Sequence, residues 1–302
     1  MKKYEKKNWR KLGNLSFAYC MCAPAVIIFT VFVMIPFFYG IYISFHNWNG
    51  LSAMTWNGVK NYLFAFKDDV FLLALGHTFI YAVLVTVLKN VSGLLLAMLV
   101  RKSFKGRTAF RVAVYLPVTF SYVVIGVLWS WIFNPTFGLL NNFLELIGAD
   151  FLIQGWLSDP KVALYSIIFV DVWRWCGFHM ILYLAGLQGI PQDLYEAAAL
   201  DGANARQRFR YITVPQLNST LVINVLMALT GAFISNYDIV NVMTGGGPFN
   251  STEVALTYIM KTALTLNNMG KACAMSVLLF LIVIFFGFIQ MKAMSRDENY
   301  AD

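Results

Sequence analysis

The sequence predicts an all-α membrane protein with six transmembrane helices. Of its 302 residues, 59% are hydrophobic and only 13% are charged, which is a larger apolar fraction than a soluble domain can bury. Six apolar runs approach the roughly 20 residues that a spanning helix needs. They lie at about 17–44, 73–100, 110–133, 162–189, 217–238 and 272–291. Helices are expected because lipid offers no partners to free backbone groups.

The first apolar run follows a basic segment, as in a signal peptide, but it is about twice as long as a signal peptide's apolar region. We see no convincing small-residue cleavage site after it, so we expect a retained first span. The chain then divides into an N-terminal segment at 1–16, a six-helix transmembrane domain at 17–291 and a tail at 292–302. No long linker or low-complexity stretch interrupts the transmembrane domain.

The distribution of Lys and Arg predicts the orientation in the membrane. Sixteen of them fall in four segments on one side: Lys2, Lys3, Lys6, Lys7, Arg10, Lys11, Arg101, Lys102, Lys105, Arg107, Arg111, Arg206, Arg208, Arg210, Lys292 and Arg296. The opposite loops hold five: Lys60, Lys67, Lys161, Lys261 and Lys271. The positive-inside rule therefore predicts that both termini are cytoplasmic. The net charge of +8 follows from topology and anionic lipid, so it gives no reason to expect nucleic acid as a partner.

Between the fourth and fifth apolar runs lies a polar, small-residue-rich stretch, here called the polar loop (residues 190–215). Good helix formers at 192–200 predict a short helix. Gly202 can adopt a positive φ and marks a turn, after which a second short helix over 204–212 ends before Pro215. From composition alone, the polar loop is either a docking surface for a soluble partner or an ordinary cytoplasmic loop.

Few residues offer catalytic or metal-binding chemistry. The sequence contains no phosphate-binding loop of the type G-x4-G-K-[ST]. Its four cysteines lie in apolar segments without metal-ligand spacing, and we interpret them as packing residues. We interpret its three histidines as packing or interface residues. We therefore predict no catalytic, cofactor-binding or metal-binding residue.

The fourth apolar run contains two ionisable residues, Asp171 and Arg174. Each costs on the order of 2.5–3.5 kcal/mol in a span, so both should face protein or water. Three residues apart, they lie on one helical face and can neutralise each other. The alternative is a polar passage lined by aromatic rings, where flat rings and fixed donors bind a small molecule. Lys89 in the second run is interpreted as a snorkelling residue or, with Asn90, as an interhelical partner.

The polar loop closely matches a family motif. Glu196-Ala197-Ala198, Gly202 and Ile212-Thr213-Val214-Pro215 resemble the EAA motif (EAA-x3-G-x9-I-x-L-P) of binding-protein-dependent ABC permeases, with Val214 in place of Leu. Three further blocks resemble carbohydrate permeases of that family: Trp56–Tyr62, Phe104–Arg107 with Leu116-Pro117, and Asn236–Asp238 through Thr244–Pro248. The last block resembles the first of two paired permeases, as in maltose, lactose and glycerol-3-phosphate importers.

This resemblance implies a type I ABC importer permease in a bacterial cytoplasmic membrane, carrying a sugar or oligosaccharide by alternating access. It implies three protein partners: a second permease subunit forming a heterodimer, a cytoplasmic ABC ATPase dimer that binds ATP and Mg²⁺, and an extracytoplasmic solute-binding protein. The chain itself would be no enzyme and would bind no cofactor. The main alternative is an ion-gradient-driven secondary transporter, although neither inverted repeats nor broken midplane helices are evident in the sequence.

The resemblance also assigns roles to residues. ATPase coupling falls to Glu196, Ala197, Ala198, Asp201 and Gly202. The substrate pathway falls to Asp171, Arg174, Trp175, Phe178, Phe233, Ser235 and Asn236. Several of these identities differ from the maltose permease, so a maltose site is not expected. A fixed guanidinium such as Arg174 suits an acidic sugar, unless Asp171 already neutralises it.

Overall fold

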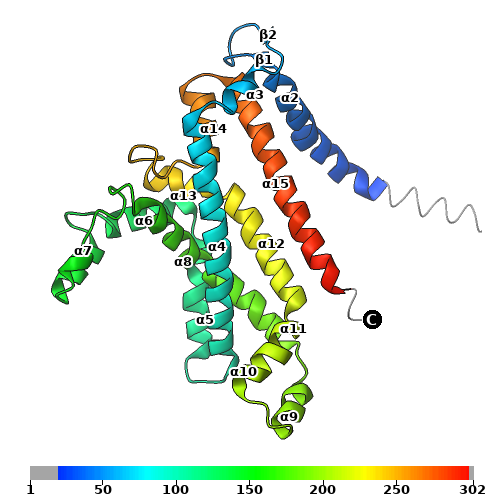
Figure 1. Cartoon of the computed structure of the whole chain (residues 1–302), viewed down its shortest axis with the longest axis vertical. Helices are drawn as coiled ribbons and strands as arrows, with labels where there is room; N and C mark the ends of the chain where they lie inside the picture. Colours follow the sequence, from blue (N-terminus) through cyan, green and yellow to red (C-terminus); the bar gives the residue numbers. More distant parts are fainter. Residues whose placement is uncertain (1–19, 299–302) are drawn as a thin grey trace, which may run out of the picture. The chain divides into compact units, whose positions relative to one another are not determined.

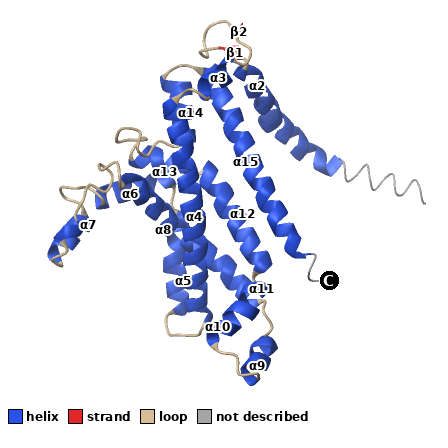
Figure 2. Cartoon of the chain, in the orientation of Figure 1, coloured by secondary structure: helices blue, strands red, loops and turns tan. Residues whose placement is uncertain are grey.

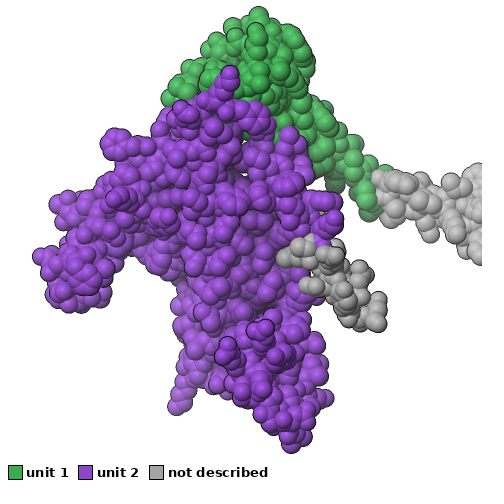
Figure 3. All heavy atoms as spheres, in the orientation of Figure 1, with its two compact units in different colours: residues 1–65, 262–277 green, residues 66–261, 278–302 purple. Residues whose placement is uncertain are grey.

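The structure is a computed structural model that describes residues 20–298; the predicted N-terminal segment at 1–16 and the last residues of the predicted tail lie outside that range. Its elements are almost entirely helical (Figures 1 and 2). The chain forms two compact units, one comprising residues 1–65 and 262–277 and the other residues 66–261 and 278–302 (Figure 3). They are described separately below, and the predicted domain boundaries stay predictions.

The first unit holds η1 (Thr30–Met34), α2 (Ile35–Ser44), β1 (His46–Asn47), β2 (Thr55–Trp56), α3 (Lys60–Ala65), most of η5 (Lys261–Thr265) and the start of α15 (Met269–Glu298). The two strands pair antiparallel, with His46 opposite Trp56. The buried Asn61 amide donates to the carbonyl oxygens of Ser44 and His46, each at 2.9 Å. Gly270 N donates to Trp48 O at 3.1 Å, so side chain and backbone together tie this hairpin to the helix ends beside it.

The second unit holds the remaining elements: α4 (Asp69–Arg101), α5 (Arg107–Tyr115), η2 (Leu116–Thr119), α6 (Tyr122–Ile132), α7 (Leu139–Leu146), η3 (Asp150–Leu152), α8 (Ala163–Gln188), α9 (Gln192–Leu200), α10 (Ala205–Arg208), η4 (Phe209–Thr213), α11 (Val214–Gln216), α12 (Asn218–Ile234), α13 (Asn236–Met243) and α14 (Ala255–Met260). Helices α4 and α8 pack side by side (Figure 1). Gly93 allows this approach, because a Cβ there would lie 2.6 Å from the Cβ of His179.

The predicted six spans are found as four long helices and two bent pairs. The long helices are Cys20–Ser44, Asp69–Arg101, Ala163–Gln188 and Met269–Gln290. The described residues therefore contain four helices long and apolar enough to span a membrane, or up to six if each bent pair counts as one span. One pair is Arg107–Thr119 with Tyr122–Ile132, and the other is Ala205–Gln216 with Asn218–Ile234.

The third predicted span, 110–133, is not one continuous helix. Its two halves meet at 103°, because Phe120 and Ser121 are extended and end the first half. Ser121 then starts α6 by accepting a hydrogen bond on its side chain from Val124 N at 3.3 Å, as an N-cap residue does. The fifth predicted span, 217–238, is also interrupted, since α12 ends at Ile234 and α13 begins at Asn236.

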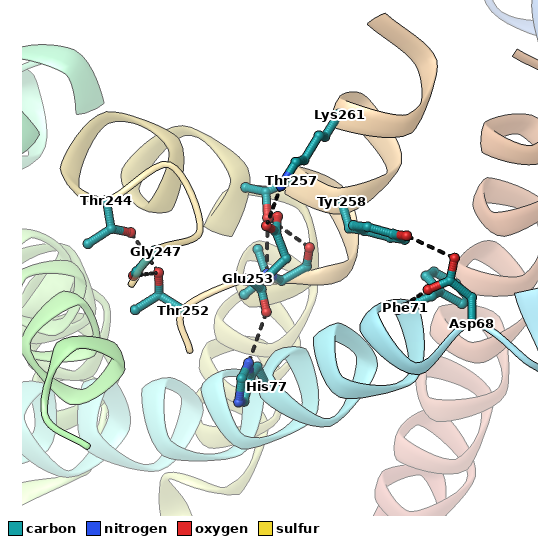
Figure 4. A network of polar contacts seen from close by, with 11 residues as sticks. Asp68, Phe71, His77, Thr244, Gly247, Thr252, Glu253, Thr257, Tyr258 and Lys261 are labelled. Carbon is teal, nitrogen blue, oxygen red and sulfur yellow. Dashed lines mark hydrogen bonds and ion pairs between the residues drawn. The ribbon is translucent and has the colours of Figure 1, made fainter. Parts of the chain in front are cut away.

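Side-chain hydrogen bonds hold the loop after α13 (Figure 4). The hydroxyls of Thr244 and Thr252 are 2.7 Å apart, and Thr252 also donates to Gly247 O at 2.6 Å. The ring of His77, on α4, lies 3.1 Å from the carbonyl oxygen of Glu253. These contacts fix the Thr-Gly-Gly-Gly-Pro block against the first turns of α4.

Candidate functional site

A cavity of about 110 Å³ lies among α4, α6, α8, α12 and the α12–α13 junction. Its walls combine aromatic rings, polar groups and small residues: Lys89, Tyr122, Trp175, Phe178, His179, Met227, Ala228, Gly231 and Ser235. The rings of Trp175 and Phe178 meet edge to face, with centroids 5.5 Å apart. Aromatic rings beside a few fixed polar groups are typical of small-molecule sites.

Lys89, which lines this cavity, belongs to a buried ion pair. The Nζ of Lys89, on α4, lies 2.7 Å from Oδ2 of Asp171, on α8, and the two side chains are 5% and 2% exposed. Lys89 Nζ also lies 5.4 Å from the Trp175 ring centroid. The snorkelling interpretation of Lys89 is therefore wrong, and the interhelical interpretation is confirmed. An ammonium has three donors, so Lys89 can bind Asp171 and still donate toward the cavity.

Asp171 and Arg174 do not form an ion pair with each other in the described structure, contrary to the pairing weighed from their spacing. Arg174 Nη2 instead donates to Phe120 O at 2.8 Å, and its Cζ lies 3.7 Å from the Tyr122 ring centroid. The spacing argument fails because Asp171 has a nearer partner on another helix. Arg174 thus holds the backbone at the α6 bend, and its Nε and Nη1 have no hydrogen-bond partner among the described residues.

Tyr122 joins the ion pair to the aromatic wall. Its hydroxyl donates to Asp171 Oδ1 at 3.4 Å and accepts from Trp175 Nε1 at 2.7 Å. The bend before α6 places Tyr122 here, because it is the first residue after the Ser121 cap. Six lining residues were not among the predicted pathway candidates, and three of them are polar: Lys89, Tyr122 and His179. A polar residue interrupting an apolar run was the only signal for Lys89, and Tyr122 had none.

The structure brings together some of the predicted pathway residues and separates others. Trp175, Phe178 and Ser235 line the cavity, while Asp171 and Arg174 lie behind its wall. The Phe233 ring stacks on Phe286 at 6.4 Å between centroids, and Asn236 is fully buried with no hydrogen-bond partner for its amide among the described residues. The role of each predicted residue in transport stays a prediction.

The polar loop has the predicted helix–turn–helix form. Helix α9 spans Gln192–Leu200 as expected, and Gly202 has φ +80° with nothing within 4 Å of a Cβ at that position. Asn204 is the N-cap of α10, in a capping box with Gln207, so the second helix begins one residue later than predicted. It continues through η4 into α11 and ends at Gln216, so the predicted end before Pro215 is wrong: Pro215 is the second residue of α11 and does not end the helix.

The tip of the polar loop exposes apolar and charged groups together. Leu200 is 90% exposed and adjoins the turn. Glu196 and Ala197 are exposed, and Ala198 is half-buried. At the base, the Tyr195 hydroxyl lies 2.9 Å from Thr213 Oγ1 and accepts from Arg101 Nη1 at 3.2 Å. The base is thus fixed to α4 and η4, while the predicted coupling residues remain accessible.

Comparison with known proteins assigns the chain to a family. Residues 89–297 match the family described as "Binding-protein-dependent transport system inner membrane component". A probable ABC transporter permease of Bacillus subtilis, YurN, is 39% identical over 282 residues, covering 92% of this chain and 96% of its own. AmyD of Thermoanaerobacterium thermosulfurigenes, named a probable starch degradation products transport system permease, is 32% identical, with 91% and 93% covered.

A solved structure supports the fold. It is the bacterial alginate ABC transporter in complex with alginate pentasaccharide-bound periplasmic protein, and one of its chains aligns with a TM-score of 0.81 at 24% identity. The alignment covers 93% of this chain and 95% of that chain. The predicted type I importer permease fold is confirmed, and the alternative of a secondary transporter is not supported. The chain belongs to the binding-protein-dependent transport system inner membrane components, as an ABC importer permease.

Proposed function

We propose that this chain is the first permease subunit of a carbohydrate ABC importer and that the cavity beside Lys89 belongs to its sugar pathway. The observation that carries the proposal is the cavity wall itself, where two aromatic faces lie beside a fixed ammonium, a phenol and a serine. Starch degradation products are named for one relative and alginate for the structural neighbour. A carbohydrate substrate agrees with both names and with the chemistry of the wall.

Coupling to ATP hydrolysis occurs through the polar loop in this proposal. Glu196, Ala197 and Ala198 lie in the second half of α9, the helix that a groove on an ATPase subunit would receive. Asp201 and Gly202 form the turn that lets α9 stand away from the spans. The exposed Leu200 beside this turn supports the proposal, since an apolar residue 90% exposed at the end of a docking helix gains from burial in a partner.

The remaining subunits follow from that role. A second permease subunit completes the pathway, a cytoplasmic ATPase dimer binds ATP and Mg²⁺, and an extracytoplasmic solute-binding protein delivers the sugar. The chain itself performs no hydrolysis. We place the polar loop and both termini in the cytoplasm, on the charge distribution, and the chain in a bacterial cytoplasmic membrane.

A pair of charge reversals on α9 tests the coupling role. In the complete transporter reconstituted with its solute-binding protein, Glu196→Arg should abolish sugar uptake and the stimulation of ATPase activity by loaded binding protein. Asp193→Arg makes the same charge change on the same helix, at an exposed position in its first turn, and should retain both. Equal uptake by the two variants would refute the assignment of Glu196.

A further inference from the structure

A second pocket lies beside the base of the polar loop, and we propose that it binds a phosphate group. This basic pocket has a volume of about 300 Å³ and is formed by the end of α4, the end of α8 and the polar loop. Its lining residues are Met98, Arg101, Lys102, Leu187, Tyr195, Ala205, Arg208, Phe209 and Thr213. It is separate from the sugar cavity, with which it shares no lining residue.

The charge of the basic pocket is unbalanced. Arg101, Lys102 and Arg208 contribute three positive charges, and no carboxylate lines it. None of the three cations forms an ion pair with a carboxylate within residues 20–298. Three positive charges around one pocket repel one another, and an anion bound between them offsets this repulsion by attracting each of them. A doubly charged oxyanion suits such a cluster best.

One of the cations is already positioned. Arg101 Nη1 donates to the Tyr195 hydroxyl at 3.2 Å, and its Cζ lies 4.6 Å from the ring centroid of the same residue. Tyr195 is held in turn by Thr213. A guanidinium fixed on one edge keeps its other donors in a planar fork, which matches two oxygens of a phosphate. Lys102, next to Arg101 at the end of α4, and Arg208, on α10, add two further positive charges to the lining.

The pocket also has apolar lining residues. Met98, Leu187 and Phe209 line it together with the cations, and the pocket adjoins the last turn of α4, one of the long spans. Anionic lipid headgroups gather at basic residues of this kind next to a span. The phosphate can therefore come from a lipid headgroup, with its glycerol against the apolar residues, or from free phosphate in the cytoplasm.

Lipid retention by the purified full transporter tests the proposal. The complex is purified from nanodiscs containing phosphatidylcholine with about 20 mol% phosphatidylglycerol, a simple anionic membrane, and its bound phosphatidylglycerol is measured by mass spectrometry. A second arm uses phosphatidylcholine alone and measures binding of radiolabelled inorganic phosphate. Both arms compare wild type with Lys102→Gln, Arg208→Gln and the double variant. Arg206→Gln is the matched control, since Arg206 is exposed on the same short helix and does not line the pocket.

Each lost pocket charge should weaken binding roughly fivefold, and the double variant roughly twentyfold or more, whereas Arg206→Gln should match wild type. Binding only in the lipid arm identifies the headgroup as the source, and binding only in the second arm identifies free phosphate. The proposal is overturned if the wild-type transporter binds neither phosphatidylglycerol nor inorganic phosphate. This result is expected if an acidic segment of the ATPase fills the pocket instead. It is also overturned if Arg206→Gln weakens binding as much as Lys102→Gln does. Because Lys102 is exposed, its substitution should leave the fold intact.

Discussion

The Lys89–Asp171 pair allows a structural role and a transport role to be separated. Breaking a buried ion pair by removing one partner costs about 3–5 kcal/mol, because the other charge stays buried alone. At 2.7 Å and with both side chains at most 5% exposed, this pair meets that condition. We therefore expect Asp171→Asn to destabilise the complex by about 3–5 kcal/mol, and Lys89→Met by less, since Asp171 keeps the Tyr122 hydroxyl.

The double variant Lys89→Met with Asp171→Asn removes both charges. It should be more stable than Asp171→Asn alone, with a coupling energy of about 2 kcal/mol or more in a double-mutant cycle. Unfolding of the detergent-solubilised protein by sodium dodecyl sulfate, followed by tryptophan fluorescence, provides the four free energies. Sugar uptake by the reconstituted transporter is measured on the same four proteins.

The two readouts should then disagree for the double variant. Stability returns toward wild type, but uptake stays reduced by about tenfold or more, the loss expected for one hydrogen bond from a charged group, because the proposed donor to the sugar is gone. Uptake that recovers together with stability would show that Lys89 acts only in folding. Additive effects of the two single substitutions, within about 0.5 kcal/mol, would refute the ion pair itself.

Three further substitutions test the architecture. Gly177→Ala should lower stability by about 1–3 kcal/mol in the same unfolding assay, because its Cβ would lie 2.2 Å from Val114 O in the backbone of α5; an unchanged midpoint would refute that close approach. Asn204→Ala removes the α10 cap, at a cost of about 1 kcal/mol, and should raise amide hydrogen exchange in the polar loop while exchange in α4 stays constant. Gly246 has φ +90°, and a Cβ at this position would lie 2.3 Å from Glu253 Oε2. Gly246→Ala should therefore lower the melting temperature and let added protease cut the loop after α13. Protease resistance equal to wild type would contradict the observed packing.

Apolar length predicted most of the spans because every backbone group in lipid must bond within its own helix. The polar loop was also predictable, since Gly202 and the polar residues around it act locally. The bend before α6 was not predicted: Pro117 and the Ser121 cap are local signals for a break, but Arg174 holds the bend from another helix. Local signals predict local structure, and this bend depends on a tertiary contact.

Dependence on tertiary contacts also explains why the residues around the cavity were only partly predicted. Spacing along one helix favoured a pair between Asp171 and Arg174, but the partner of Asp171 is Lys89, which lies 82 residues earlier in sequence. Tyr122 enters the site only through the bend. Trp175, Phe178 and Ser235 line the cavity as their predicted role requires. Phe233 and Asn236 are buried, and their assignment rests on the resemblance alone.

Disulfide crosslinking tests the central claim most directly, namely that the polar loop transmits ATP-driven motion from an ATPase subunit. Leu200→Cys is introduced into a chain whose four native cysteines are replaced by serine, and the ATPase carries single cysteines along its permease-facing groove. Leu146→Cys is the matched control, because Leu146 is 83% exposed and lies at the end of α7. We predict a crosslink from position 200 whose yield changes when ATP binds, and none from position 146. No crosslink from position 200, or one equally strong from position 146, would contradict the account.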